Sequence, residues 1–321
     1  MSLFGSLYVG ASGLQTGQNA LNTTAHNLSN VDTKGYTRQQ TLLTDKNYNL
    51  LSVNPKAAAN QQTGLGVTYA DVRQVRDSFL DQKYRKESGR SAFYEVSYNT
   101  LGEVETLLGE LDGESFSESM NDLWESVQEL AKQPASSVTQ GLLIQRASQF
   151  VEQAGNVYSA LSKYQDNLNN QIKGEVDQIN QYADRLFALN NEIIKIETGG
   201  IERANDLRDE RNQILDALGG YGNISYSEDW NGSVNVKYEG HTLVNATQVF
   251  KVGLDQDSDT GFYTPFWQGD AKKIPQENGT FRYDISNCKV FDLTREISTA
   301  CNTDIGSLKG MLVARGDHRA D

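Results

Sequence analysis

The first part of the chain has apolar residues at the heptad spacing of a coiled coil. Leucine recurs every seven residues, and Ala or Gln occupies the position between each pair: Leu7, Ala11, Leu14, Gln18, Leu21, Ala25 and Leu28. This spacing predicts a helix that packs its leucines on a partner helix. The other faces hold Ser, Thr, Asn, Gln and Gly, and interior glycines weaken a helix. We therefore expect the helix to be held by partners, with its small polar faces on neighbouring copies of the chain. The alternative is an N-terminal helix with an ordinary core stripe.

The next part of the chain predicts a strand followed by two helices. Residues 44–65 are polar and are expected to be irregular, and the alternation of Val67 and Tyr69 predicts a short strand that leads into a helix near Asp77. The second helix is capped by Ser115 or Ser117 and closed by Pro134. Its apolar residues recur at helical spacing and are expected to be core residues: Met120, Leu123, Trp124, Val127 and Leu130.

One very long helix is predicted from about Val138 to Thr198. Its apolar seam is shifted once by four residues, beside Gly174, and such a shift locally unwinds a coiled coil. The seam positions before and after this shift are Ala147, Ala154, Leu161 and Leu168, then Ile172, Ile179, Leu186 and Ile193. A turn at Gly199 and Gly200 leads into a further helix, which is expected to end at Gly219 and Gly220.

After Gly220 the apolar period changes from that of a helix to that of a strand. Asn231-Gly232 is a hairpin signal, and Val234, Val236 and Tyr238 alternate on one face. The fold class is therefore mainly α with an inserted β domain: an N-terminal coiled-coil helix, a bundle of long helices and a small β-rich domain. The expected parts are 1–65 (axial helix and exit loop), 66–220 (helix bundle), 221–302 (β domain) and 303–321 (start of a return into the helical domain).

The net charge of the chain limits the classes of molecule that it can bind. The chain has 321 residues and a formal net charge of −13. Residues 1–44 carry only Asp32, Lys34 and Arg38, so the negative charge lies in the rest of the chain. An acidic body argues against nucleic acid and against a polybasic membrane contact. The chain also has no basic residue before an apolar run at its start, as a cleaved signal peptide would have, and no apolar run long enough for membrane insertion. Composition alone would place it in the cytoplasm.

Candidate chemistry is sparse. His26, His241 and His318 are scattered, and no catalytic or metal-binding motif is present. Cys288 and Cys301 are too few for a disulfide framework and either pair or stay free. We expect no catalytic, cofactor-binding or metal-binding residue. The alternatives from another class of protein are a carbohydrate-binding cleft around Trp230 or Trp267 and a hydrolytic enzyme seated in the β region.

The segment that follows the heptad helix resembles the signature of the bacterial flagellar rod, hook and hook-associated proteins. It matches the pattern Asn-x-x-Asn-x-x-Thr-x-Gly-Tyr-Ser/Thr-Arg at Asn27, Asn30, Thr33, Gly35, Tyr36, Thr37 and Arg38. It departs from the commonest form at Asp32, usually Asn, and at Lys34, often Pro. Asn27 and Asn30 can cap the helix end, and Gly35 can adopt a positive φ, so the signature predicts a helix stop and a sharp exit. The predicted assembly interface comprises Leu7, Leu14, Leu21, Leu28, Asn27, Asn30, Thr33, Gly35 and Tyr36.

Later segments resemble the hook-associated proteins of the hook-filament junction more narrowly. These segments are 66–80, which holds Asp77, Phe79 and Leu80, the helix 204–211, with Ala-Asn-Asp-Leu-x-Asp-x-Arg, and the strand pair 234–244. Residues 306–315 resemble the point where that family returns to its helical domain. The family then continues to a C-terminal heptad helix that pairs with the N-terminal one, so the resemblance implies the N-terminal part of a longer protein.

The resemblance implies a structural role without catalysis. The expected function is that of an adaptor at the hook-filament junction that is needed for filament assembly; the alternative is a hook or distal rod protein. The implied partners are copies of the chain in a ring or helical assembly, the hook protein, a second junction protein, and the flagellar type III export apparatus with its chaperone. The implied location is extracellular, in the flagellum, after export without a cleaved signal peptide.

Overall fold

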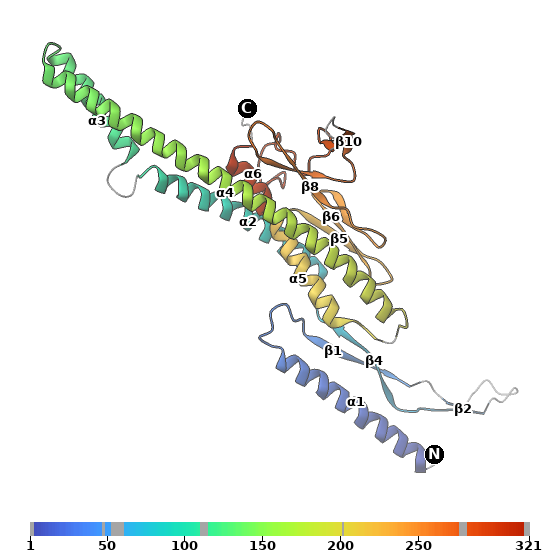
Figure 1. Cartoon of the computed structure of the whole chain (residues 1–321). Coiled ribbons are helices and arrows are strands. Elements are labelled where there is room, and N and C mark those ends of the chain that lie inside the picture. The colour runs from blue at the N-terminus through green and yellow to red at the C-terminus, as the bar shows by residue number, and fades with distance from the viewer. Residues whose placement is uncertain are drawn as a thin grey trace.

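The computed structural model describes residues 3–46, 49–52, 61–109, 115–200, 202–275 and 281–317. The molecule is elongated, with the N-terminal helix at one end and a helical hairpin at the other (Figure 1). The helices are α1 (Leu3–Ser29), α2 (Ser78–Leu107), α3 (Phe116–Lys132), α4 (Ser137–Glu197), α5 (Asn205–Tyr221) and α6 (Ser307–Arg315). The predicted fold class, mainly helical with a small β part, is confirmed.

The N-terminal helix lies beside a long antiparallel hairpin. Strand β1 (Gln39–Asp45) pairs with β4 (Val67–Gln74), and between them β2 (Asn49–Ser52) pairs with β3 (Gln61–Thr63). Residues 44–65 were expected to be irregular, and that expectation was wrong for these strands, because backbone pairing across the hairpin orders a segment that has no apolar alternation. The pairing of β1 with β4 crosses the expected boundary at 65/66, and the division into four parts stays a prediction.

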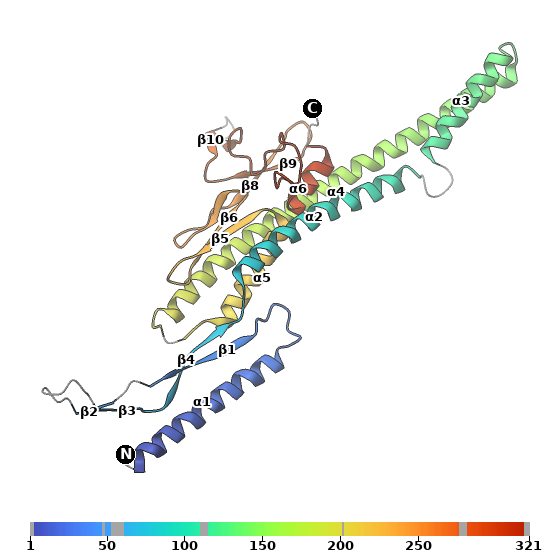
Figure 2. The same cartoon turned by 180° about the vertical axis from the view of Figure 1, so that it is seen from behind.

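The long helix is confirmed as α4, which has 61 residues and runs along the whole helical part (Figures 1 and 2). Side chains of the second half of the predicted seam are buried, namely Ile172, Ile179, Leu186 and Ile193, and so is Leu168, the last position of the first half. The three earlier positions, Ala147, Ala154 and Leu161, are only partly covered. Helix α2 begins near Asp77 as predicted, and Asp77 caps it by accepting the amides of Phe79 and Leu80. Helix α5 ends at Tyr221, one residue beyond the expected Gly219 and Gly220.

The core prediction for α3 was wrong in part. Leu123 and Leu130 are partly buried, but Met120, Trp124 and Val127 are 51%, 62% and 41% exposed. Ser115 caps the helix through the amide of Glu118 at 3.0 Å, as predicted. Helix α3 packs mainly on α4 (Figure 1), so this neighbour covers only part of an apolar face that spans two stripes.

The β region packs on one side of α4 and α5 (Figure 2). It contains a three-stranded antiparallel sheet and two strand pairs, β8–β9 and β10–β11. The strands are β5 (Ile224–Glu228), β6 (Val234–Tyr238), β7 (His241–Val244), β8 (Val252–Gln256), β9 (Tyr263–Trp267), β10 (Lys272–Pro275) and β11 (Phe281–Asp284). Val234, Val236 and Tyr238 are buried on one face, as the alternation predicts.

Three asparagines on α4 hold the β region by its backbone. Asn190 donates to the carbonyl of Val234 at 2.9 Å and accepts the amide of the same residue at 3.0 Å. Asn180 makes the same pair of bonds with Val252, both at 2.9 Å. Asn169 accepts the amide of Tyr263 at 2.8 Å. Backbone groups that the sheets leave unpaired against the helix are thereby satisfied.

The last described helix, α6, returns to the helical part and packs on α2 and α4. Gly306 precedes it with φ +100°, and its amide donates to the carbonyl of Gly89 at 2.9 Å. A Cβ at Gly306 would lie 2.5 Å from the carbonyl oxygen of Tyr221, so only glycine fits this crossing.

Candidate assembly interface

The predicted leucine seam is on the surface. Leu7, Leu14, Leu21 and Leu28 are 68%, 79%, 70% and 73% exposed. A monomeric surface rarely leaves four leucines of one helix stripe in water, because each loses about 1.5–3 kcal/mol of possible burial. The seam is therefore available to a partner helix. That it contacts one stays a prediction.

The opposite face of α1 packs on the chain's own hairpin. Ser12 and Thr16 are 6% and 5% exposed. The Ser12 hydroxyl accepts the amide of Val67 at 3.3 Å, and Thr41 of β1 hydrogen-bonds to Thr23 at 3.0 Å. The small polar residues of this face were expected to contact neighbouring copies; Ser12 contacts β4 and Thr23 contacts β1 instead, because short hydroxyl side chains can hydrogen-bond to a strand at close approach.

The exit from α1 is held by Asn27. Its side-chain oxygen accepts the amide of Gln39 at 2.8 Å and the hydroxyl of Tyr36 at 2.7 Å, and its amide group donates to the carbonyl of Gln39 at 2.8 Å. Asn27 therefore does not cap the helix; it joins α1 to the first residue of β1. Burial, and then the negative charge of Asp209, raise the pKa of the Tyr36 phenol.

Asn30, Thr33 and Gly35 shape the turn itself. Asn30 caps α1 as predicted, since its side chain and its backbone amide both donate to the carbonyl of His26, at 3.0 and 3.2 Å. The Thr33 hydroxyl donates to the side-chain oxygen of Asn30 at 3.2 Å. Gly35 has φ +83°, the positive value predicted for the sharp exit. These residues thus build the exit loop, which we define as residues 30–38.

The exit loop and hairpin dock on α5. Asp209 is 5% exposed and accepts the amide of Thr37 at 3.2 Å and the side-chain amide of Gln74 at 2.7 Å. Asn205 donates to the carbonyl of Val72 at 2.8 Å. Burial raises the pKa of Asp209, although the hydrogen bonds from Thr37 oppose that shift. The resemblance of 204–211 to a family motif signalled this helix, but not that its Asn and Asp receive the hairpin.

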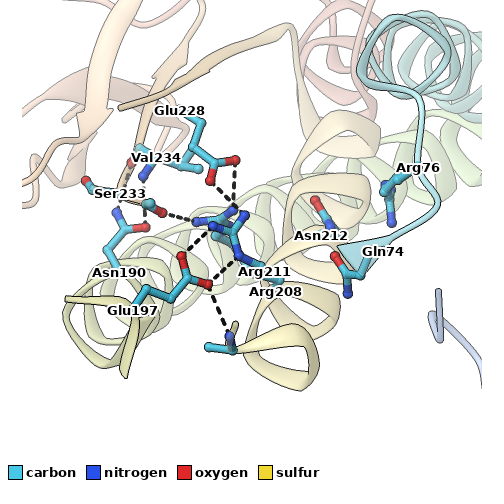
Figure 3. A network of polar contacts seen from close by, with 12 residues as sticks. Gln74, Arg76, Asn190, Glu197, Arg208, Arg211, Asn212, Glu228, Ser233 and Val234 are labelled. Carbon is cyan, nitrogen blue, oxygen red and sulfur yellow. Dashed lines mark hydrogen bonds and ion pairs between the residues drawn. The ribbon is translucent and has the colours of Figure 1, made fainter. Parts of the chain in front are cut away.

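Charged side chains fix the end of α4 against α5 and the sheet, as Figure 3 shows. Arg208 forms ion pairs with Glu197 and Glu228, each at 2.7 Å. Arg211 is 3% exposed, donates to the carbonyl of Gly232 at 2.6 Å and lies 3.2 Å from Glu228. The Glu197 hydrogen bond is the largest influence on the Arg208 guanidinium and raises its pKa. The hairpin of β1 and β4 therefore docks on a helix, α5, that these ion pairs fix to α4 and to the sheet of β5, β6 and β7. We call α4, α5 and this sheet the platform.

Catalytic and ligand-binding alternatives gain no support from the described residues. The structure brings together no group of three metal-ligating side chains in the ranges it describes. Trp267 is 2% exposed and belongs to the core, whereas Trp230 is 98% exposed on a hairpin turn, so the two do not form a cleft. Cys288 is buried and Cys301 exposed, and both are free. His318 lies outside the described residues. Among the described helices, none is long and apolar enough to cross a bilayer.

Two comparisons with protein families match this architecture. Residues 7–37 match the flagella basal body rod protein family, and residues 101–281 match the family described as flagellar hook-associated protein FlgK helical domain. The fold and the exposed N-terminal helix thus define a structural protein of the bacterial flagellum. The second match covers more than half of the chain, which belongs to the flagellar hook-associated protein 1 (FlgK) family. The predicted family and its non-enzymatic, structural class are confirmed.

Comparisons with individual proteins lead to the same family. The chain is 30% identical over 232 residues to flagellar hook-associated protein 1 of Bacillus subtilis, covering 72% of this chain and 45% of that protein. It is 29% identical over 238 residues to the protein of the same name from Salmonella typhimurium, covering 74% and 42%. The flagellar hook junction protein FlgK from Burkholderia pseudomallei shares the fold, with a TM-score of 0.55 at 17% identity over 74% of this chain and 39% of that one. The chain thus spans less than half the length of these relatives.

Proposed function

We propose that the chain is part of the adaptor that joins the flagellar hook to the filament. The observation that carries this proposal is the family match over residues 101–281, because it separates hook-associated proteins from the rod proteins that share only residues 7–37. Relatives that cover most of the chain carry the name flagellar hook-associated protein 1. The alternative, a hook or distal rod protein, would share only the N-terminal signature.

The proposed mechanism is mechanical. The leucines of α1 face a coiled-coil partner in the assembled axis, and the hairpin of β1 and β4 transmits the position of α1 to α5 through Asp209 and Asn205. Because the platform around Arg208 and Arg211 is fixed by ion pairs, α1 has a defined direction relative to the long helices. The β region lies to one side of the helical part and would face away from the axis (Figure 2).

The proposed partners are copies of this chain in a ring or helix, the hook protein and a second junction protein. The charge-free surface of α1 supports contacts between copies, because close packing of identical charged helices would bury like charges. The proposed route is export by the flagellar type III apparatus, with its chaperone, to an extracellular site in the flagellum without cleavage of a signal peptide.

Immunogold electron microscopy of isolated flagella tests this function. The antibody is raised against the β region, residues 225–299, and the control is a strain that lacks the gene. A narrow band of label where the hook meets the filament is the expected result. Label along the whole hook would favour the hook-protein alternative, and label confined to the cell body would contradict the assignment to the flagellum.

A further inference from the structure

Trp230 is the most exposed large apolar side chain among the residues that the structure describes, at 98%. It lies at the tip of the hairpin that joins β5 to β6, between Asp229 and Asn231. An indole has a large apolar surface and one N–H group, which donates a hydrogen bond. Tryptophan is among the residues that contribute most to the binding energy of protein interfaces.

The turn that carries Trp230 is fixed to the platform. The amide of Gly232 donates to the carbonyl of Asp229 at 3.0 Å, and the carbonyl of Gly232 accepts Arg211 of α5 at 2.6 Å. Gly232 has φ +83°, and a Cβ there would lie 2.9 Å from a carboxylate oxygen of Glu197 on α4. Because α4 and α5 hold the turn, little backbone entropy is lost when its indole packs on a partner.

A groove of about 570 Å³ lies between the end of α4, the start of α5 and the hairpin of β1 and β4. Four apolar side chains line it. Tyr69 of β4 and Ile196 of α4 are 36% and 43% exposed, and Val72 and Leu207 are half-buried. A groove of this size with an aromatic ring and aliphatic groups on its walls has room for a large apolar side chain of a partner.

Asn205 adds a polar group to the groove. It is 8% exposed, its side-chain amide donates to the carbonyl of Val72 at 2.8 Å, and its side-chain oxygen has no hydrogen-bond partner among the described residues. A buried acceptor without a partner costs about 1–3 kcal/mol. The N–H group of an indole is a donor only, so it is the chemical complement of this oxygen. The charged residues of the groove include both signs, Glu202 and Asp206 beside Arg203.

Trp230 and the groove lie on different sides of α5. Arg211 holds the Trp230 turn, whereas Asn205 lines the groove and bonds to β4. These two residues of α5 are about 120° apart around the helix, at 100° per residue. In Figure 3, Glu228, on the strand that leads to the turn, and Gln74, on β4, lie on opposite sides of α5. The exposure of Trp230 shows that it does not fill the groove of its own chain.

Both features lie at the same end of α4. The groove includes Ile196, and the turn lies beside Glu197, the last residue of that helix. A copy rotated about the long axis of the molecule can thus bring its turn to the groove of a neighbour without a large shift along that axis. A contact between two different surfaces repeats from copy to copy in one direction, which generates a ring or, with a rise, a helix.

We propose that Trp230 of each copy of this chain enters the groove of the next copy, in one direction around the assembly. The indole packs on Tyr69 and Ile196 of the neighbour, and its N–H group donates to the side-chain oxygen of Asn205. The contact rests on the proposed function, in which copies form a ring or helix. The groove also reaches His26, beside the exit from α1, so the contact adjoins the predicted assembly interface.

Photo-cross-linking in isolated flagella tests this contact. p-Benzoylphenylalanine at position 230 keeps a large aromatic group, and on irradiation its ketone adds to a C–H bond that it touches. Products of two, three and more chains are expected, because each copy both gives and receives an aromatic group. Peptide mapping should find the new bond at Tyr69, Ile196 or Leu207. Products that stop at two chains, no product, or a bond outside the groove would overturn the proposal.

Matched tyrosine variants separate the groove from the rest of the surface. Tyr69→Ala removes one wall of the groove and should lower the yield of cross-linked chains by about fivefold or more. Tyr98→Ala changes the same residue type at a site on α2 that is 78% exposed, and it should leave the yield unchanged. Equal effects of the two variants would overturn the proposal.

Trp230→Ala, without the cross-linker, gives a second measurement. The amount of chain retained in isolated flagella should fall by about tenfold, and Trp230→Phe should fall less because it keeps an aromatic ring. Thermal unfolding of the purified chain should not change, since the side chain is 98% exposed. Retention equal to that of the unchanged chain would overturn the proposal.

Immunogold labelling of the same flagella distinguishes this contact from the proposed function. A band of label at the hook-filament boundary, without cross-linked products, overturns the contact alone. Label confined to the cell body overturns the proposed function and the contact with it.

Discussion

At the scale of single residues, the least usual group is a carboxyl between α4 and α6. Ser307 donates its hydroxyl to both oxygens of Glu175, at 2.8 and 3.0 Å, and no ion pair of Glu175 is found among the described residues. Burial disfavours the charged form and raises the pKa of Glu175 to about 7, although the Ser307 hydrogen bond acts in the opposite direction. Burial also raises the pKa of Glu239 to about 7.

We expect Glu175→Gln to stabilise the protein at pH 8 and to have little effect at pH 4. The folded state keeps a proton on Glu175 up to about pH 7, whereas the unfolded chain releases it near pH 4.5. Stability from this group is therefore fully present below pH 4.5 and is lost as pH rises to about 7. Glutamine cannot ionise, so it should gain about 1–3 kcal/mol at pH 8. Urea unfolding at both pH values measures this, and an equal effect at the two would contradict it.

Asn27 is the residue on which the exit from α1 depends. Asn27→Ala removes both hydrogen bonds to Gln39 and the one to Tyr36, and leaves partly buried backbone groups without partners. The local opening free energy should fall by about 1–3 kcal/mol. Hydrogen exchange at the Gln39 amide should become faster by about tenfold or more. Asn22→Ala, on the exposed side of the same helix, is the control and should leave that amide unchanged.

At the scale of elements, α4 organises the molecule through polar as well as apolar residues. Its buried seam residues pack on α5, α6 and the β region, while Asn169, Asn180 and Asn190 hold strand backbones. Helix α1 is the opposite case: a hydroxyl and amide face packs on the hairpin, and the apolar face stays exposed. The role of a helix face in this protein therefore follows from the groups opposite it.

Asn190→Ala should lower the free energy of unfolding by about 2–3 kcal/mol, because the amide and the carbonyl of Val234 lose their partners in a buried site. Chemical denaturation followed by circular dichroism measures it. Asn170→Ala changes the same residue type on an exposed position of α4 and should shift stability by less than about 0.5 kcal/mol. Equal losses in the two variants would mean that the side-chain bonds to Val234 do not hold β6.

At the scale of the whole molecule, two exposed apolar surfaces lie at opposite ends. The α1 seam is at one end and the exposed side chains of Met120, Trp124 and Val127 on α3 are at the other, with α4, α5 and the sheet between them (Figure 1). An elongated subunit with separate contacts at its two ends is suited to span between neighbours in an assembly. The ion pairs around Arg208 and Arg211 keep the platform between those ends rigid.

Leu14→Asp together with Leu21→Asp should block incorporation into the flagellum without unfolding the rest of the chain. A carboxylate in the seam would be buried against the partner helix, which costs several kcal/mol, whereas both positions are about three-quarters exposed in the free chain. Immunoblots of isolated flagella measure incorporation, and thermal unfolding of the purified variant serves as the control. Normal incorporation would show that the seam is not an assembly contact.

The sequence by itself determined the five helices before residue 222, the strand pair 234–244 and the family, because each depends on local spacing or on a contiguous motif. The period of apolar residues marks α4 over 61 residues, and the signature marks the exit loop with Gly35 at positive φ. These features need no knowledge of what lies opposite them.

Only the tertiary structure decided which faces are covered. Trp124 and Leu123 belong to one apolar set in the sequence, yet α4 covers Leu123 and leaves Trp124 exposed. Asn27, Asn190 and Asp209 gain their roles from backbone groups that are distant in the chain or lie across a turn. Burial and long-range hydrogen bonding depend on the neighbour as much as on the residue, and spacing along the chain carries no information about that neighbour.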